Sequence, residues 1–279
     1  MTGADESART DTSLAELFDL DRVDRDLYVG MPGPAAGPPG REHTYGGLVA
    51  AQALRAAIHT VDPERAPHSL HGYFLRPGDA AKPVVLEAYR DRDGGSFSAR
   101  RVVARQEGEV IFSLAASFHI EEESGEYEPA IPSDLPDPDD VVARHSDRGG
   151  PTGQFDFRSF QPPGVDGPVV MPTRYWVRAA ESLPDDPSLH VCALTYLSDL
   201  GSGFGRVDVP GLAIVGPSID HTLWFQRPVR VDDWLLVDLW PLRASRAVGT
   251  YAGTIHARSG ALAAALTQEC LLRRRPETT

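Results

Sequence analysis

The chain has 279 residues, of which 41% are hydrophobic and 24% charged, and this balance is typical of a globular protein with a substantial core. Its formal net charge of −13 argues against nucleic acid or an anionic membrane as the main partner. No apolar run is long enough to span a membrane, and the polar residues 1–11 do not resemble a secretion signal, so we expect a cytoplasmic protein.

The elements expected in the first part of the chain are one long helix and a set of antiparallel strands. A short amphipathic helix at Ser13–Phe18 and an edge strand at Leu27–Gly30 come first. Residues Gly46–Ile58 then form a helix of small apolar residues with little polar surface, which predicts that a sheet covers it. Turn signals at Asp91–Gly95 and Gln106–Glu109 separate the β runs that follow, which are 71–76, 84–89, 96–104 and 110–118.

A proline-rich linker separates this part from a second set of elements. Nine of the 24 prolines fall between residues 120 and 172, where Phe155–Arg158 is expected as an edge strand. A strand at Arg174–Ala179 comes next. An apolar helix then begins near Pro187, because proline suits a first helical position, and stops by Gly201. The later strands are expected at 218–225, 234–240, 248–257 and 261–273.

The two sets of elements look like copies of one unit. Phe74–Pro77 matches Phe225–Pro228 at an offset of 227 − 76 = 151, and the same offset places Ser117 opposite Gln268 (268 − 117 = 151). An offset kept over several strands indicates an internal duplication. We therefore predict an α+β fold with two repeats of a long helix wrapped by a curved antiparallel sheet. The expected N-terminal repeat, Pro/Asp-rich linker and C-terminal repeat are 13–119, 120–171 and 172–275.

The usual signatures of nucleophilic, phosphate-binding and metal-dependent sites are missing from the sequence. Cys192 and Cys270 lack a metal-binding spacing and lie in apolar runs, which predicts buried, reduced thiols. The glycine-rich run Gly201–Gly205 lacks the lysine of a phosphate loop, so we interpret it as a helix stop. We expect neither a metal nor a cofactor.

One carboxylate stands out because of the helix that carries it. The helix after Pro187 is apolar nearly all round, yet Asp199 sits near its end, where burial raises the pKa of a carboxyl. The first helix has no matching acid and offers mainly Ala and Leu with a lone Gln52. Two readings stay open from the residues alone. Asp199 is either a buried base or a residue that emerges at the surface, and Gln268 and Ser218 either position a water or complete hydrogen bonds at strand edges.

Several motifs occur in order along the chain: His71–Asp79, Arg92–Arg101, Pro184–Asp186, Tyr196–Asp199, Ile219–Phe225 and Gln268–Glu269. Together they resemble the acyl-CoA thioesterase II family over residues 13–119 and 172–273. The resemblance implies a double hotdog fold and hydrolysis of a thioester by a water held between an Asp, a Gln and a Thr hydroxyl. By position these roles fall on Asp199, Gln268 and Ser218, with serine in place of the family's threonine.

The function expected from this resemblance is hydrolysis of acyl-CoA to a free fatty acid and CoA by a homo-oligomer, either a dimer or a tetramer. Two alternatives remain, a hotdog hydratase or dehydratase and a protein that binds acyl-CoA without turnover. Asp220 and His221 are neighbours on a strand and point to opposite faces, so no dyad is expected and His221 is interpreted as structural. By the same alternation, one of Arg100 and Arg101 is a candidate for ligand contact.

Overall fold

The computed structural model describes residues 12–128, 136–141, 150–159, 173–206 and 214–273. The polar residues 1–11 lie outside these residues, as does about half of the predicted linker. We call residues 12–128 the N-terminal half and residues 136–273 the C-terminal half.

The elements of the N-terminal half are α1 (Leu14–Leu17), β1 (Leu20–Asp24), β2 (Leu27–Gly30), β3 (Ala35–Ala36), β4 (His43–Thr44), α2 (Gly46–Ile58), β5 (Ala66–Phe74), β6 (Val84–Asp93), β7 (Phe97–Gln106) and β8 (Glu109–His119). Those of the C-terminal half are η1 (Pro138–Asp140), η2 (Gly150–Gln154), β9 (Phe155–Ser159), β10 (Arg174–Ala179), α3 (Pro187–Ser198), η3 (Gly203–Arg206), β11 (Ile214–Ser218), β12 (Asp220–Phe225), β13 (Leu235–Ser245), β14 (Val248–Ala257) and β15 (Leu262–Arg273).

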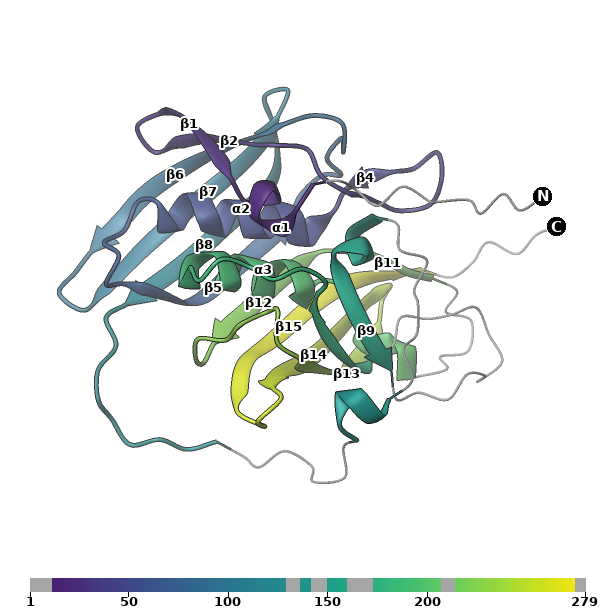
Figure 1. Ribbon diagram of the computed structural model, residues 1–279. Coiled ribbons are helices and arrows are strands. Elements are labelled where there is room, and N and C mark those ends of the chain that lie inside the picture. The colour runs from purple at the N-terminus through teal and green to yellow at the C-terminus, as the bar shows by residue number, and fades with distance from the viewer. Residues whose placement is uncertain (1–11, 129–135, 142–149, 160–172, 207–213, 274–279) are drawn as a thin grey trace, which may run out of the picture.

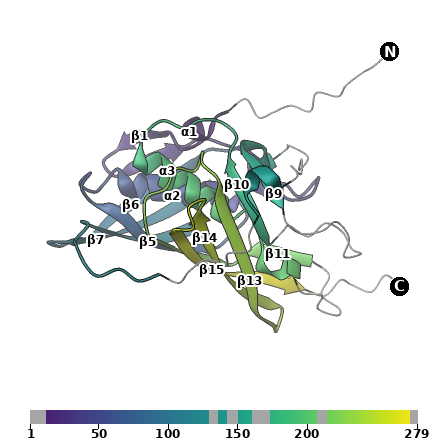
Figure 2. The same ribbon diagram turned by 60° about the horizontal axis from the view of Figure 1, so that its bottom comes forward.

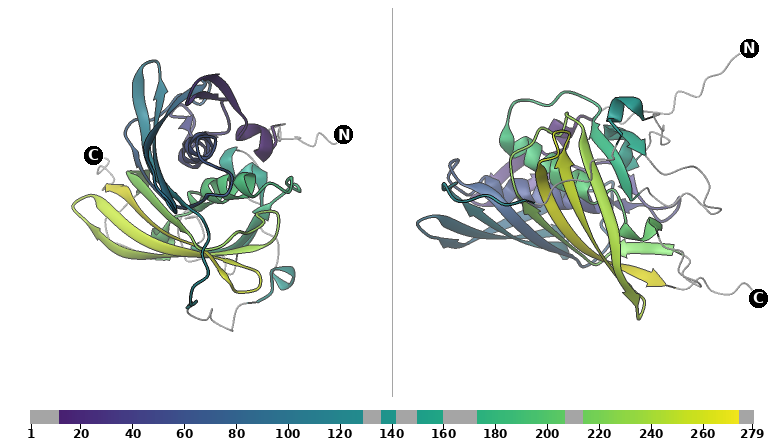
Figure 3. Two further views of the ribbon diagram at one scale, coloured as in Figure 1. Left: turned by 90° about the vertical axis from the view of Figure 1, so that its left-hand side faces the viewer. Right: turned by 90° about the horizontal axis from the view of Figure 1, so that it is seen from below.

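One antiparallel sheet runs through both halves. Among the described residues it has 13 strands in the order β1-β2-β6-β7-β8-β5-β12-β15-β14-β13-β10-β9, and β11 adds to β15 (Figure 1). The halves join where β5 pairs with β12. Viewed along α2, the purple-to-blue strands curve around that helix, and the green-to-yellow strands form a second curved layer beside it (Figure 3, left). Residues 155–159 pair with β10, which confirms the edge strand expected there.

The two long helices pack against each other on the inner face of the sheet (Figure 2). Helix α2 contains no Pro or charged residue before Arg55, and its small side chains are buried. Gly47 allows a close approach to α3, because a Cβ there would lie 2.5 Å from the backbone oxygen of Tyr196. The Tyr45 hydroxyl donates to that same oxygen at 2.9 Å. Glycine and a buried tyrosine therefore lock the start of α2 against the last turn of α3.

Helix α3 begins and ends as its sequence indicates. The side chain of Asp186 caps the first turn by accepting from the backbone nitrogen of Ser188 at 2.9 Å, and Pro187 is the first helical residue. The helix ends at Ser198, and Asp199 is its C-cap. Asp199 therefore lies just past the last helical residue, so its side chain does not follow the direction of the helical side chains.

The strand registers are compatible with an offset of 151 between β5 and β12, but then require a different one at the last strand. At that offset Phe225 on β12 is the counterpart of Phe74 on β5, since 225 − 74 = 151. Leu114 lies opposite Gly72, and Leu266 lies opposite Leu223, so the last strands differ by 266 − 114 = 152. The counterpart of Gln268 is consequently Ala116 and not Ser117. A shift of one residue moves a side chain to the other face of a sheet, and Ser117 faces outward, where its hydroxyl contacts His68 at 2.8 Å.

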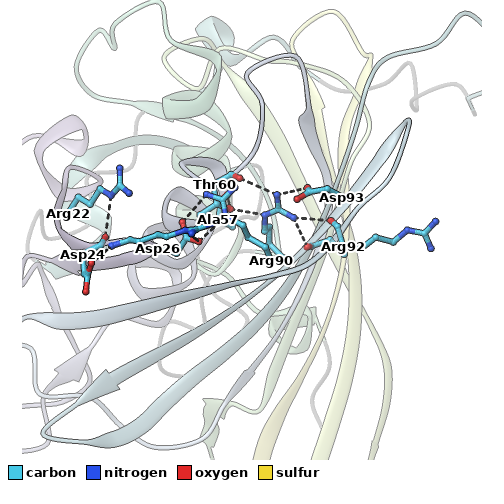
Figure 4. Close-up of polar contacts among 11 residues, drawn as sticks. Arg22, Asp24, Asp26, Ala57, Thr60, Arg90, Arg92 and Asp93 are labelled. Carbon is cyan, nitrogen blue, oxygen red and sulfur yellow. Dashed lines mark hydrogen bonds and ion pairs between the residues drawn. The ribbon is translucent and has the colours of Figure 1, made fainter.

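A buried arginine in the N-terminal half binds the segment that follows the C-terminal end of α2. Arg100 is 2% exposed, and its guanidinium donates to both oxygens of Thr60 and to Asp93, the last at 2.6 Å. Figure 4 shows Thr60 and Asp93 facing each other across this network. Because these bonds and two further ones to backbone oxygens of Arg92 and Ala99 occupy the guanidinium, Arg100 serves the fold and is not a ligand contact.

The strand β1 is the main element that the sequence did not predict. It pairs with β2 through a bulge between Arg22 and Asp24, and most of its side chains are exposed. Exposed edge strands lack the alternating apolar pattern that identifies a strand from sequence.

Candidate active site

Asp199 lies where three separate segments of the C-terminal half meet. Its half-buried carboxylate accepts from the Gln268 side-chain amide, with 2.9 Å between Nε2 and Oδ1, and from the Ser218 hydroxyl at 3.3 Å. The same amide also donates to the Ser218 hydroxyl. All three residues proposed from the sequence are therefore in mutual hydrogen-bond contact.

The strands around β15 bring Ser218 and Gln268 to this point. Ser218 ends β11, and its backbone lies opposite Cys270 after an irregularity in the β11–β15 register. Gln268 lies in the middle of β15 and points inward with 2% of its surface exposed. Ser218 thus hydrogen-bonds the side chains of both Asp199 and Gln268, which is more than the completion of a strand edge.

The N-terminal half also contributes to the site, through the start of α2. The backbone N–H of Gly47 lies close enough to the Asp199 carboxylate to lower its pKa. A Cβ built on Gly46 would lie 2.8 Å from Asp199 Oδ2 and 2.9 Å from the Phe74 ring, so the helix terminus is in close contact with the acid. The side chain of the N-cap residue, Tyr45, does not cap the helix. The first N–H groups of α2 are thus directed at the site, and the helix dipole makes this end favourable for negative charge.

The sequence alone did not identify α2 as the helix whose N-terminus lies at the site, although a signal for it was present. Two consecutive glycines, Gly46 and Gly47, open an otherwise apolar helix. Glycine at a helix start is a sign that another group approaches the backbone closely.

The surroundings of Asp199 make its carboxyl a weaker acid than usual. Loss of solvation raises its pKa, and this effect outweighs the opposing influence of His221 and of the hydrogen bonds from Gln268, Ser218 and Gly47. Burial and the Asp199 charge also raise the pKa of the phenols of Tyr45, Tyr175, Tyr196 and Tyr251, so these remain neutral. The site therefore contains one carboxyl whose pKa is moved toward neutrality, as a general base requires.

Comparison with known proteins assigns the chain to a family. A family model described as the acyl-CoA thioesterase N-terminal domain matches residues 34–119, and one described as the C-terminal domain matches residues 130–272. The chain is 30% identical to acyl-coenzyme A thioesterase 8 of Mus musculus over 95% of this chain and 90% of that protein. The chain belongs to the acyl-CoA thioesterase family.

Solved structures of similar proteins agree with this membership. The acyl-CoA thioesterase II TesB2 of Mycobacterium marinum is 37% identical, with a TM-score of 0.79 over 95% of this chain and 99% of that one. A protein from Alicyclobacillus acidocaldarius described as having a hot dog fold is 23% identical, with a TM-score of 0.75 over 94% of this chain and 98% of that one. The family member described here accordingly has a hotdog fold.

Other candidates from the sequence lie differently in this thioesterase. The Asp220 carboxylate accepts from the backbone nitrogen of Glu269 at 2.7 Å, whereas the His221 ring points inward to Gln268 and Ser198, so the two form no dyad, as predicted. Arg101 is exposed, pairs with Asp91 and lies over the Tyr89 ring, away from Asp199.

The remaining polar features do not form a second reactive site. Cys192 and Cys270 are buried and unpaired, as predicted, and burial raises the pKa of the Cys192 thiol to about 12 and that of Cys270 to about 11. Across the described ranges, no group of three His, Cys, Asp or Glu residues is placed to hold a metal ion. In those same ranges, no helix has the length and apolar character needed to cross a membrane.

A surface cavity of about 590 Å³ lies at the opposite end of the C-terminal strands, lined by residues that include Arg178, Trp234 and Arg258. Its arginines are engaged, because Arg178 pairs with Asp156 at 3.3 Å and Arg258 with Asp137 at 2.6 Å. The candidate reactive site is therefore placed at Asp199 and not in this surface cavity.

Proposed function

We propose that this chain hydrolyses acyl-CoA thioesters to a fatty acid and CoA with a water held by Asp199, Ser218 and Gln268. The observation that carries the proposal is the convergence of the three side chains on one point beside the start of α2. A carboxylate, a hydroxyl and an amide supply the acceptor and donors that orient one water, and family membership supplies the reaction class.

The reaction follows from the positions of these groups. Asp199 accepts a proton from the water, and the water oxygen forms a bond to the thioester carbon. Gln268 and Ser218 fix the remaining hydrogen bonds of the water during this step. The tetrahedral intermediate then collapses, the C–S bond breaks, and the CoA thiolate leaves with the proton that Asp199 returns. The acyl group departs as a carboxylic acid.

The start of α2 is suited to stabilise the oxyanion of the intermediate. The first-turn N–H groups of α2 have no partner within the helix and lie beside the carboxylate that activates the water. Backbone donors at a helix N-terminus favour the charge that develops on the carbonyl oxygen, and such donors are worth about 3–4 kcal/mol each in other acyl-transfer enzymes. In this proposal the C-terminal half supplies the base, and the N-terminal half supplies the oxyanion site.

The same proposal covers the organisation of the chain. Two hotdog repeats, 13–119 and 172–275 joined by the linker 120–171, account for a long helix in each half and for the matched registers of β5 with β12 and β8 with β15. The polar positions of the site have apolar counterparts in the first repeat, namely Pro67 for Ser218 and Ala116 for Gln268 (218 − 67 = 151; 268 − 116 = 152). The first repeat is therefore a degenerate copy. Cytoplasmic location and homo-oligomeric assembly stay predictions.

The test is to incubate the purified protein with acyl-CoAs of graded chain length and to follow free CoA with a thiol reagent. We expect release from wild type and a loss of at least about 100-fold in kcat for Asp199→Asn, because an amide does not accept the proton from water. No release across the series by folded protein would favour a binding protein. Hydration of an enoyl-CoA instead of CoA release would favour a hydratase. Full activity of Asp199→Asn would refute the site and leave the reaction class in place.

A further inference from the structure

His221 is a fully buried histidine that contacts the proposed site from behind. It lies on β12, 0% exposed, and its counterpart in the N-terminal half is Leu70 (221 − 70 = 151). Thr222 lies opposite Thr267 in the β12–β15 ladder, so the next rung brings His221 beside Gln268 on the inner face. The ring Nδ1 is hydrogen-bonded to Gln268 Oε1, and Nε2 lies 2.8 Å from the Ser198 hydroxyl.

The contact with His221 decides which way the Gln268 amide faces. A glutamine side chain ends in one acceptor and one two-hydrogen donor, and the torsion that exchanges them is broad. Here Nε2 faces the Asp199 carboxylate and the Ser218 hydroxyl, and Oε1 faces His221. In the reversed orientation Oε1 would face a carboxylate, which also only accepts, and the Nε2 hydrogens would face the His221 ring. A donor on the ring therefore favours the working orientation together with the carboxylate, because in the reversed one it would meet the Nε2 hydrogens.

The ring supplies that donor in two of its three protonation forms. Both the imidazolium and the neutral form with hydrogen on Nδ1 donate to Oε1, whereas the neutral form with hydrogen on Nε2 presents a lone pair to it. Ser198 adapts to either working form. Its hydroxyl donates to the backbone oxygen of Thr195 at 2.8 Å when Nε2 carries a hydrogen, and it turns to donate to Nε2 otherwise.

We propose that His221 is a positioning residue for hydrolysis, which holds the Gln268 amide so that its two hydrogens point to the side of Asp199 and Ser218, where the water is held. Ser198, directly before Asp199, anchors the other side of the ring to α3. The ring thus ties the strand that carries the amide to the helix that carries the acid. This inference rests on the function proposed above for Asp199, Ser218 and Gln268.

The decisive comparison uses two substitutions that differ by one methylene group. In His221→Asn the side-chain amide takes the place of Nδ1 and donates to Gln268, whereas in His221→Gln it reaches the place of Nε2 and donates to Ser198. His221→Leu, which introduces the residue found at the counterpart position, removes both bonds. Thermal unfolding and circular dichroism verify that each variant is folded. If His221→Leu does not fold, the comparison of His221→Asn with His221→Gln still tests the proposal.

We expect kcat for release of CoA to fall by about 10–100-fold in His221→Leu and His221→Gln while KM changes by less than about threefold, since the lost interaction orients the water rather than the substrate. His221→Asn should keep kcat within about fivefold of wild type. Equal values of kcat in His221→Asn and His221→Gln, or a kcat of His221→Leu within about twofold of wild type, would overturn the proposal.

A second measurement separates positioning from general packing. In a Gln268→Ala background, exchanging His221→Asn for His221→Gln should no longer change kcat, because the group being positioned is gone. A difference that persists there overturns the proposal. Asp199→Asn, assayed in parallel, distinguishes the two levels of failure. If it is active, the proposed site is wrong, and if it is inactive while His221→Leu is active, only the role of His221 is wrong.

Discussion

The glycine at the start of α2 offers a direct test of how closely the two halves must fit. In Gly46→Ala the new Cβ would lie 2.8 Å from Asp199 Oδ2 and 2.9 Å from the Phe74 ring. Because non-bonded carbon contacts are favourable at about 3.5 Å or more, the carboxylate must retreat by roughly 0.7 Å. A displacement of about 1 Å costs up to about 100-fold in rate, so we expect kcat to fall by about 10–100-fold.

The same substitution should leave the fold intact. Alanine is favoured over glycine in a helix by up to about 1 kcal/mol, and the atoms that must move are the ends of two side chains and not backbone. The change in the free energy of unfolding is therefore expected to stay within about 1 kcal/mol. Release of CoA followed with a thiol reagent gives kcat and KM, and thermal unfolding gives the stability.

Gly95→Ala is the matched control, because a Cβ at Gly95 meets no atom within 4 Å. It should change neither kcat nor stability appreciably. If Gly46→Ala is folded and its kcat lies within about twofold of wild type, the argument that the start of α2 fixes the position of the Asp199 carboxylate is wrong.

Three further outcomes are expected. Since Asp199 must be ionised to accept a proton and burial raises its pKa, kcat/KM should fall on the acid side with a midpoint above the ordinary value of about 3.9, and a lower midpoint would contradict the assignment. Because the pKa of Asp199 is raised in the folded state, wild type loses stability as the pH rises through that pKa. Asn does not titrate, so the Tm of Asp199→Asn minus the Tm of wild type should increase with pH. A constant difference in Tm would count against this. Arg100→Met should lower the free energy of unfolding, measured in urea, by about 2–4 kcal/mol, because the buried oxygens of Thr60 lose their donor. The control Arg101→Met, at an exposed position, should lower it by less than about 1 kcal/mol. Equal losses would refute the structural role of Arg100.

Local sequence signals were sufficient to predict the positions of the two long helices and of most strands. The run of small apolar residues in α2 and the Asp186–Pro187 pair before α3 determine where these helices lie, because capping and side-chain size act within a few residues. Glycine turns separated β6 from β7 and β7 from β8 in the same way. The exposed strand β1 lacked such a signal, and it forms because β2 offers it a pairing edge.

Register and site geometry depend on contacts between distant segments. The one-residue difference that exchanges Ser117 for Ala116 follows from how the last strand of each half pairs with its neighbour, and spacing alone does not reveal it. Asp199, Ser218 and Gln268 were proposed through a family resemblance, and the structure places them in contact. The positions of Gly47 and His221 beside these residues were not expected, since one comes from packing of two helices and the other from a neighbouring rung of the sheet.

The contact of Gly47 with Asp199 also constrains how the chain can evolve. The acid belongs to one half and the start of α2 to the other, so the two halves are not interchangeable. Leu70 and Ala116 in the N-terminal half are apolar, whereas the start of α2 in that half needs small residues because a Cβ there would meet Asp199 or Tyr196. The chain therefore has freedom to diverge around Ala116 and little at Gly46 and Gly47, although the proposed catalytic side chains lie elsewhere.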